Sequence, residues 1–168
     1  MSRISFVFAT GESWLDRLVT IITRSRWSHV AIRFEAENIL AEALVFRGLI
    51  LEPGEKYDSW PVMQMISCEV DQLFYQKMLA LSRVWGEKHI PYGYPTCIAI
   101  GIKSLLGLTA GKLALKILPG KAEATLVCSE MIVKLWRIGV PDFLAGHEPR
   151  LVSPDDLYYI FSRYKGEI

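Results

Sequence analysis

A cysteine at the start of an apolar helix is the first residue that could do chemistry. Cys128 stands where the strand-like stretch that ends at Val127 turns into a helical pattern. A thiol at a helix N-terminus faces unpaired backbone N–H groups and the positive end of the helix dipole, and both favour the thiolate. Because the thiolate attacks carbonyl carbon, the sequence predicts Cys128 as the nucleophile of a hydrolase or transferase. The alternative is an inert thiol, since free cysteines are often buried as small apolar side chains.

His29 is the candidate base for this thiol. It lies in the strand-like run 28–34, in which Val30, Ile32 and Phe34 point one way and His29 points the other. The histidine therefore belongs to the less apolar face of its strand, where a cleft could lie. The competing interpretation is a surface or edge histidine with no chemical role.

Glu42 is the candidate partner of His29. It lies within the apolar run 39–45, where a carboxylate loses hydration and needs a hydrogen-bond partner. If this strand pairs with the His29 strand, Glu42 can accept a hydrogen bond from one imidazole nitrogen and leave the other free as the base. An ion pair with Arg33 or Arg47 is the alternative.

Composition limits the class of protein. The chain has 168 residues, of which 51% are hydrophobic and 22% are charged, as in one compact domain. With 19 basic and 18 acidic residues there is no overall field to attract nucleic acid, so a nucleic-acid partner is not expected. Three cysteines without C-x-x-C spacing predict neither disulfides nor a metal site, and no motif calls for a cofactor. The N-terminal residues lack the pattern of a signal peptide, so we expect the protein to be in the cytoplasm when it is synthesised.

The remaining pattern predicts an α+β fold in which an antiparallel sheet packs against helices. Alternating apolar residues predict strands, and apolar stripes with capping residues predict helices. Strands are expected at 4–9, 28–34, 39–45 and 62–70, as an antiparallel meander, with a Gly- and Pro-containing stretch before the last. Helices are expected after Ser13, over 71–89, from Cys128 to Gly139, and after Ser153.

The most apolar tract lies between Cys97 and Leu118. Lysines and glycines interrupt it, which argues against a transmembrane helix and favours two short helices. We expect an apolar helical insertion at about 96–120 within a single domain that covers 1–168. It could pack on the core, or it could form a lid or a membrane-contacting element through 98–118.

Five short motifs in this order resemble a known family. They are Trp-Ser-His-Val-Ala-Ile at 27–32, Ala-Glu-Ala at 41–43, Pro-Tyr-Gly-Tyr at 91–94, Val-Cys-Ser-Glu-Met-Ile at 127–132 and Ser-Pro-Asp-Asp-Leu at 153–157. The set resembles the circularly permuted NlpC/P60 group of papain-like cysteine amidases and peptidases, and its YiiX-like members most of all. The resemblance implies a permuted papain-like fold with the nucleophile at a helix N-terminus. Permutation would explain why the histidine precedes the cysteine, because such triads are defined by geometry.

The resemblance also implies the roles of the site residues. Cys128 would be the nucleophile, His29 the general base and acid, and Glu42 the group that orients the imidazole. Tyr92 matches a tyrosine near the nucleophile in this superfamily, and Tyr94 competes for that place.

The substrate implied by the resemblance is an amide bond in the peptide stem of bacterial peptidoglycan. The enzyme would then act in a periplasm after specialised secretion or lysis, or on recycled wall peptides in the cytoplasm, and an inhibitory or delivery partner protein could accompany it. Related permuted proteins of the lecithin:retinol acyltransferase type act on lipid esters, and the apolar tract favours that alternative. A third hypothesis is a non-catalytic interaction module.

Overall fold

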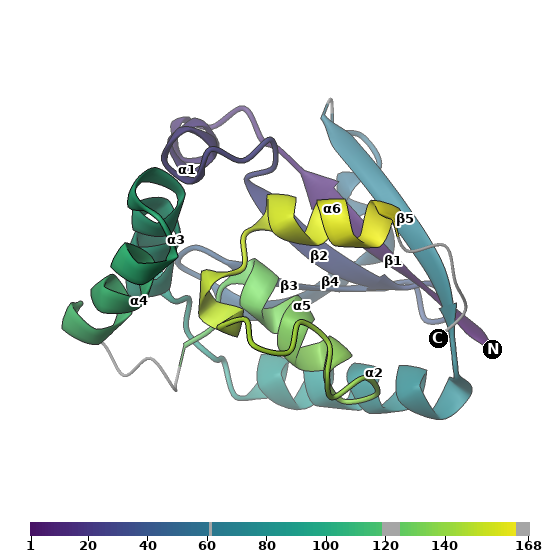
Figure 1. Ribbon diagram of the computed structural model, residues 1–168. Helices are drawn as coiled ribbons and strands as arrows, with labels where there is room; N and C mark the ends of the chain where they lie inside the picture. Colours follow the sequence, from purple (N-terminus) through teal and green to yellow (C-terminus); the bar gives the residue numbers. More distant parts are fainter. Residues whose placement is uncertain (61, 119–124, 164–168) are drawn as a thin grey trace.

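The computed structural model describes residues 1–60, 62–118 and 125–163. Within them the chain forms an α+β fold with a five-stranded antiparallel sheet and six α-helices (Figure 1). The strands are β1 (Ser2–Ala9), β2 (His29–Phe34), β3 (Ile39–Leu44), β4 (Gly48–Pro53) and β5 (Met63–Val70). The helices are α1 (Trp14–Thr23), α2 (Gln72–Glu87), α3 (Tyr94–Leu106), α4 (Leu108–Ile117), α5 (Cys128–Trp136) and α6 (Pro154–Arg163). Two short 3-10 helices are η1 (Gly54–Tyr57) and η2 (Pro149–Leu151).

The order of the strands corrects the predicted meander. The sheet runs β4-β3-β2-β1-β5, so β1 to β4 form a meander, whereas β5 crosses back to pair with β1. The sequence does not predict β4, because its short apolar run, Leu49 to Leu51, lies between Gly48 and Pro53, which indicate a turn. The consequence is that β3, which carries Glu42, is an interior strand with partners on both sides.

One face of the sheet carries the main hydrophobic core. Helices α2, α5 and α6 pack on this face with residues such as Met78, Trp136 and Phe161. Val30, Ile32 and Phe34 of β2 lie in the same core, whereas Ala31 lies in a smaller cluster on the opposite face. The predicted alternation of β2 is therefore confirmed, and it fixes the side of the sheet to which His29 belongs.

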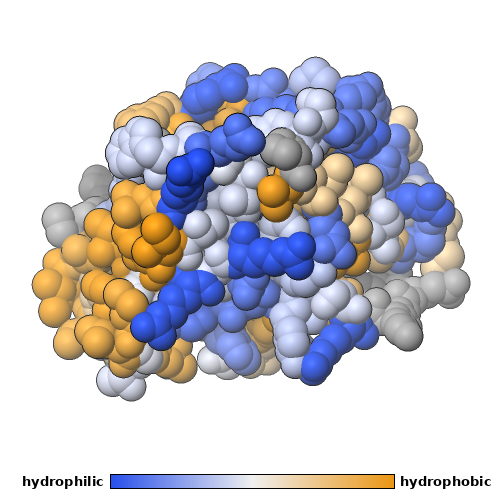
Figure 2. All heavy atoms as spheres, turned by 90° about the horizontal axis from the view of Figure 1, so that it is seen from above, coloured by the Kyte–Doolittle hydropathy of each residue, from blue (hydrophilic) through white to orange (hydrophobic). Residues whose placement is uncertain are grey.

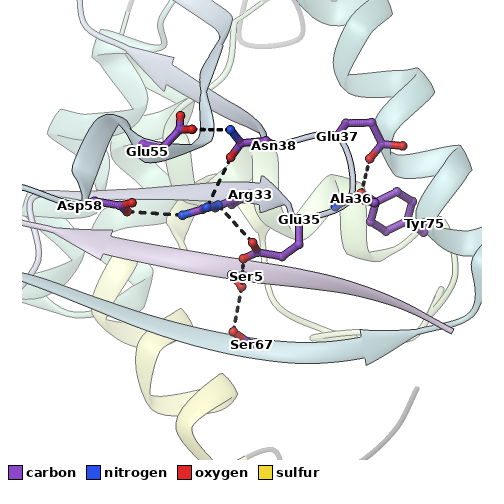
Figure 3. Close-up of polar contacts among 10 residues, drawn as sticks. All are labelled: Ser5, Arg33, Glu35, Ala36, Glu37, Asn38, Glu55, Asp58, Ser67 and Tyr75. Carbon is purple, nitrogen blue, oxygen red and sulfur yellow. Dashed lines mark hydrogen bonds and ion pairs between the residues drawn. The ribbon is translucent and has the colours of Figure 1, made fainter.

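The opposite face carries a polar network beside the smaller cluster (Figure 3). Arg33 forms ion pairs with Glu35 and Asp58 and donates a hydrogen bond to Asn38. Ser5 of β1 donates to Glu35, so the network ties the centre of the sheet to the turn after β2. The Arg33 guanidinium is thus occupied by acidic partners of this network.

Helices α1, α3 and α4 form one end of the molecule, away from α2 and β5 (Figure 1). Two short helices were predicted in the apolar tract, and α3 and α4 confirm that prediction, with Gly107 between them at a φ of 92°. Helix α1 begins after Ser13, which caps it by accepting from Asp16 N, as the sequence predicts. Among the described residues, none of the helices is long and apolar enough to cross a bilayer.

Candidate active site

Helix α5 places the candidate nucleophile. Cys128 is its first residue, and the preceding Val127 caps the helix with no side-chain hydrogen bond. The apolar side of α5 is buried in the core through Ile132, Leu135 and Trp136, as predicted, although the helix ends at Trp136, before Gly139. This burial holds the N-terminus of α5 against the sheet, and the Cys128 sulfur accepts hydrogen bonds from the backbone N–H groups of Val30 and Ser129.

The register of β2 and β3 brings His29 and Glu42 together. Ile32 pairs with Ala41, which puts His29 and Glu42 on the same face of the sheet, one diagonal step apart. His29 Nε2 lies 3.0 Å from Glu42 Oε2. With Nε2 held by Glu42, Nδ1 is the ring nitrogen left for the Cys128 thiol, with which the His29 side chain also forms a hydrogen bond. The structure therefore brings the three predicted side chains into one chain of contacts.

Glu42 has two further partners that the sequence analysis did not name. Lys56 forms an ion pair with Oε1, and the Tyr57 hydroxyl donates to Oε2. Neither of the predicted alternatives pairs with Glu42, because Arg33 binds its own acidic network and Arg47 lies 2.8 Å from Glu52. Both Lys56 and Tyr57 belong to η1, which directly follows the strand that was missed. The Gly- and Pro-containing context concealed them, since it indicates a turn and not a buried partner.

The protonation states of this site follow from its contacts. Burial by itself would lower the pKa of His29, but the hydrogen bonds and negative charges of Cys128 and Glu42 raise that pKa to about 9. Burial likewise opposes ionisation of Cys128, yet the His29 hydrogen bond and charge, with the two backbone N–H groups, lower the pKa of the thiol. Both shifts favour the charged pair, a thiolate beside an imidazolium, over the neutral pair.

Glu42 completes the charge arrangement. Its side chain is fully buried, which alone would raise its pKa. The hydrogen bond and charge of His29, followed by the hydrogen bonds from Lys56 and Tyr57, instead lower the pKa of Glu42 to about 2. A carboxylate that is ionised at neutral pH therefore lies behind the imidazole, where it fixes the ring and favours its protonated form.

Tyr92 lies beside the segment that leads into Cys128. Its backbone pairs with Leu126, and Gly93 N donates to Leu126 O at 3.0 Å. The Tyr92 hydroxyl contacts Cys97 Sγ at 3.1 Å. Burial raises the pKa of Tyr92, so its hydroxyl is neutral.

Tyr94, the competing candidate, is turned toward the β3–β4 connection. Its hydroxyl accepts a hydrogen bond from Phe46 N at 3.1 Å, and its side chain is half exposed. Of the two tyrosines, Tyr92 is therefore the one whose backbone is joined to the nucleophile segment.

Gly48 allows the Tyr92 segment to approach the sheet. Its φ is 71°, and a Cβ atom there would lie 2.3 Å from Ile90 O. The next residue, Leu49, donates its N–H to the same oxygen at 2.9 Å. Only glycine combines this backbone angle with so close a contact, so Gly48 is the residue that anchors the chain just before Tyr92.

The other cysteines have no such environment. Burial raises the pKa of Cys68 and of Cys97 to about 12, so both remain thiols. All three cysteines are unpaired, and no group of three His, Cys, Asp or Glu side chains in the described ranges could hold a metal ion. A cavity of 530 Å³ between α3 and α6, lined by Lys103 and Asp156, contains none of the predicted site residues.

Comparisons with models of protein families, with curated proteins and with solved structures found no match.

Proposed function

We propose that this protein is a cysteine hydrolase that cleaves an acyl bond through a thioester on Cys128. The observation that carries the proposal is the contact chain from Cys128 to His29 to Glu42, in which the thiol pKa is lowered and the imidazole pKa is raised. An ion pair of this kind has a desolvation cost in a buried site, and nucleophilic catalysis gives a reason for that cost. A non-catalytic interaction module would have no use for it.

The mechanism starts from the thiolate. Its sulfur attacks the carbonyl carbon of the substrate, and the carbonyl oxygen becomes an oxyanion that backbone N–H groups at the start of α5 can stabilise. One such donor typically contributes about 2.7–4 kcal/mol to lowering the barrier. The imidazolium of His29 donates its proton to the leaving amine or alcohol, the bond to that group breaks, and a thioester forms. Neutral His29 then takes a proton from water, and the resulting hydroxide attacks the carbonyl carbon of the thioester. The carbon–sulfur bond breaks, which releases the acid and restores the thiolate.

The same features support a permuted papain-like fold. In that arrangement a helix presents its N-terminal cysteine to a histidine on an antiparallel sheet, and α5 and β2 stand in this relation. The chain order, with the histidine and its carboxylate before the cysteine, is the order that the permuted NlpC/P60 resemblance implies. We assign Tyr92 a positioning role near Cys128, since its backbone pairs with the segment that ends at the nucleophile.

For the substrate we propose an amide in a peptidoglycan stem peptide, as the resemblance implies. In that case the enzyme acts where wall peptides occur, in a periplasm or during wall recycling, and a delivery or inhibitory protein would accompany it. A lipid ester is the second candidate, and a specific observation favours it: the helices beside the site, α1, α3 and α4, expose large apolar side chains.

The test compares wild type with Cys128→Ala on two substrates, purified wall peptides and phospholipid vesicles, with products identified by mass spectrometry. We expect wild type to cleave one of them and to carry an acyl adduct on Cys128, and Cys128→Ala to lose at least about 10³-fold in rate, because the thioester cannot form. Cys68→Ala is the matched control, since Cys68 is another unpaired cysteine and lies outside the site. Cleavage that persists in Cys128→Ala would overturn the proposal.

A further inference from the structure

The end of the molecule formed by α1, α3 and α4 exposes an unusual number of large apolar side chains. Figure 2 shows them gathered at this end of the molecule. The most exposed are Trp14 at 71% and Ile21 at 72% in α1, Leu106 at 75% in α3, and Leu113 at 56% and Ile117 at 70% in α4. We call this surface the apolar end. A contiguous exposed patch of this kind marks an interaction site in a folded protein.

Close packing joins the three helices into one surface. A Cβ atom on Gly101 of α3 would lie 2.2 Å from Ile22 Cγ2 of α1, so the glycine lets α1 and α3 touch. A Cβ atom on Gly111 of α4 would lie 2.7 Å from Lys103 Cβ of α3. The small residues therefore face inward, between the helices, and the large apolar residues are left on the outside.

The charges of the apolar end have one dominant sign. Between Lys88 and Leu118 the sequence has no Asp or Glu. Lys103 is paired with Asp156, whereas Lys112 and Lys116 of α4 are exposed among the apolar side chains. Helix α1 contributes the exposed Arg17, and its own acidic residue, Asp16, accepts a hydrogen bond from Ser28.

We propose that the apolar end is a peripheral docking surface for a bilayer that contains anionic phospholipids. Exposed leucine, isoleucine and tryptophan side chains can enter the interfacial layer, while lysines at the margin reach the negative headgroups. A second copy of the chain fits less well, because a symmetric contact through this surface would bring lysines against lysines. No helix in the described part of the chain could span the membrane, so the contact is with its surface.

The docking surface adjoins the candidate active site. Helix α3 begins at Tyr94, two positions after Tyr92, and Tyr92 pairs with the segment that leads into Cys128. Binding through α1, α3 and α4 would hold this site close to the bilayer. The proposal concerns binding alone, so it stands or falls independently of the hydrolase.

The test is sedimentation of the full chain with vesicles of phosphatidylcholine, with and without phosphatidylglycerol. We expect binding to the vesicles that contain phosphatidylglycerol, weaker binding to phosphatidylcholine alone, and a loss of binding at high salt. Leu106→Glu and Ile117→Glu should each weaken binding about tenfold or more, and Lys112→Glu combined with Lys116→Glu should do the same. Leu73→Glu is the matched control, because Leu73 is 58% exposed but lies on α2, away from the apolar end.

Two further measurements decide between the alternatives. Cys128→Ala should bind vesicles as wild type does, since docking needs no thioester, and circular dichroism should show each glutamate variant folded. Absent binding, binding that ignores phosphatidylglycerol, or an equal loss in Leu73→Glu would overturn the proposal. A wild-type dimer that Leu106→Glu dissociates, measured by sedimentation velocity in the absence of vesicle binding, would assign the surface to a second copy.

Discussion

At the scale of single residues, the environment of Cys128 differs sharply from that of the other two cysteines. Contact with His29 lowers its pKa, whereas burial without a basic partner raises the pKa of Cys68 and Cys97 to about 12. The same chemical group is thus favoured as a thiolate at one position and as a neutral thiol at two. The sequence singled out Cys128 by its helix start, but Cys97 also lies in the first turn of a helix, α3, so the contact with His29 is what distinguishes Cys128.

Alkylation should reveal this difference directly. Iodoacetamide at neutral pH is expected to modify Cys128 before Cys68 or Cys97, since only the thiolate reacts. His29→Ala should slow the modification of Cys128 about tenfold or more at that pH, because burial then acts on the thiol without an opposing charge. Peptide mapping by mass spectrometry over a range of pH measures each site. An ordinary free-thiol profile for Cys128, unchanged by His29→Ala, would contradict the ion pair.

At the scale of elements, capping residues and periodicity predicted helices well. Ser13, Asp71 and Ser153 each accept a hydrogen bond from a backbone N–H at the start of α1, α2 and α6, where the sequence placed these helices. Strand β4 was not predicted, because three apolar residues between Gly48 and Pro53 carry too little alternation to separate a strand from a turn. Because the sequence does not predict β4, it also does not identify Lys56 and Tyr57, which follow that strand, as partners of Glu42.

The contact between α1 and α3 can be tested with a double-mutant cycle. Gly101→Ala should lower the free energy of unfolding by about 1–3 kcal/mol, because the new methyl group meets Ile22 Cγ2. In an Ile22→Ala background the same change should be neutral, or stabilising by up to about 1 kcal/mol through helix propensity. Urea unfolding of the four proteins measures the coupling. Equal costs in both backgrounds would show that this contact does not set the spacing of the helices.

At the scale of the whole molecule, two neighbouring strands of the sheet, β2 and β3, supply His29 and Glu42 of the candidate site. The two strands that supply His29 and Glu42 were predicted from their apolar runs, and their pairing followed from a short connection. The crossing of β5 to β1 could not be predicted, because edge pairing depends on the packing of α2 and β1 and not on a local signal. The contact between His29 and Glu42 could therefore be anticipated from the sequence, whereas the order of the strands in the sheet could not.

The buried carboxylate should affect the stability of the whole fold in acid. Since the pKa of Glu42 falls from 4.5 to about 2 on folding, its ionised form stabilises the protein above about pH 4.5. That contribution, about 3 kcal/mol, is lost as the pH falls through about 2. Urea unfolding at near-neutral and at acid pH should show a smaller acid loss in Glu42→Gln than in wild type. Equal losses would mean that Glu42 is not held ionised.

The missing side-chain cap of α5 has a consequence for ligands. In α1, α2 and α6 the side chain of a Ser or Asp accepts a hydrogen bond from one of the first N–H groups, but Val127 has no side-chain oxygen. The first turn of α5 therefore has backbone N–H groups that the side chain of its cap residue does not bind, and an outside oxygen can accept hydrogen bonds from them. A bound acid or acyl group would accept hydrogen bonds from these N–H groups, and its binding would raise the melting temperature of the protein.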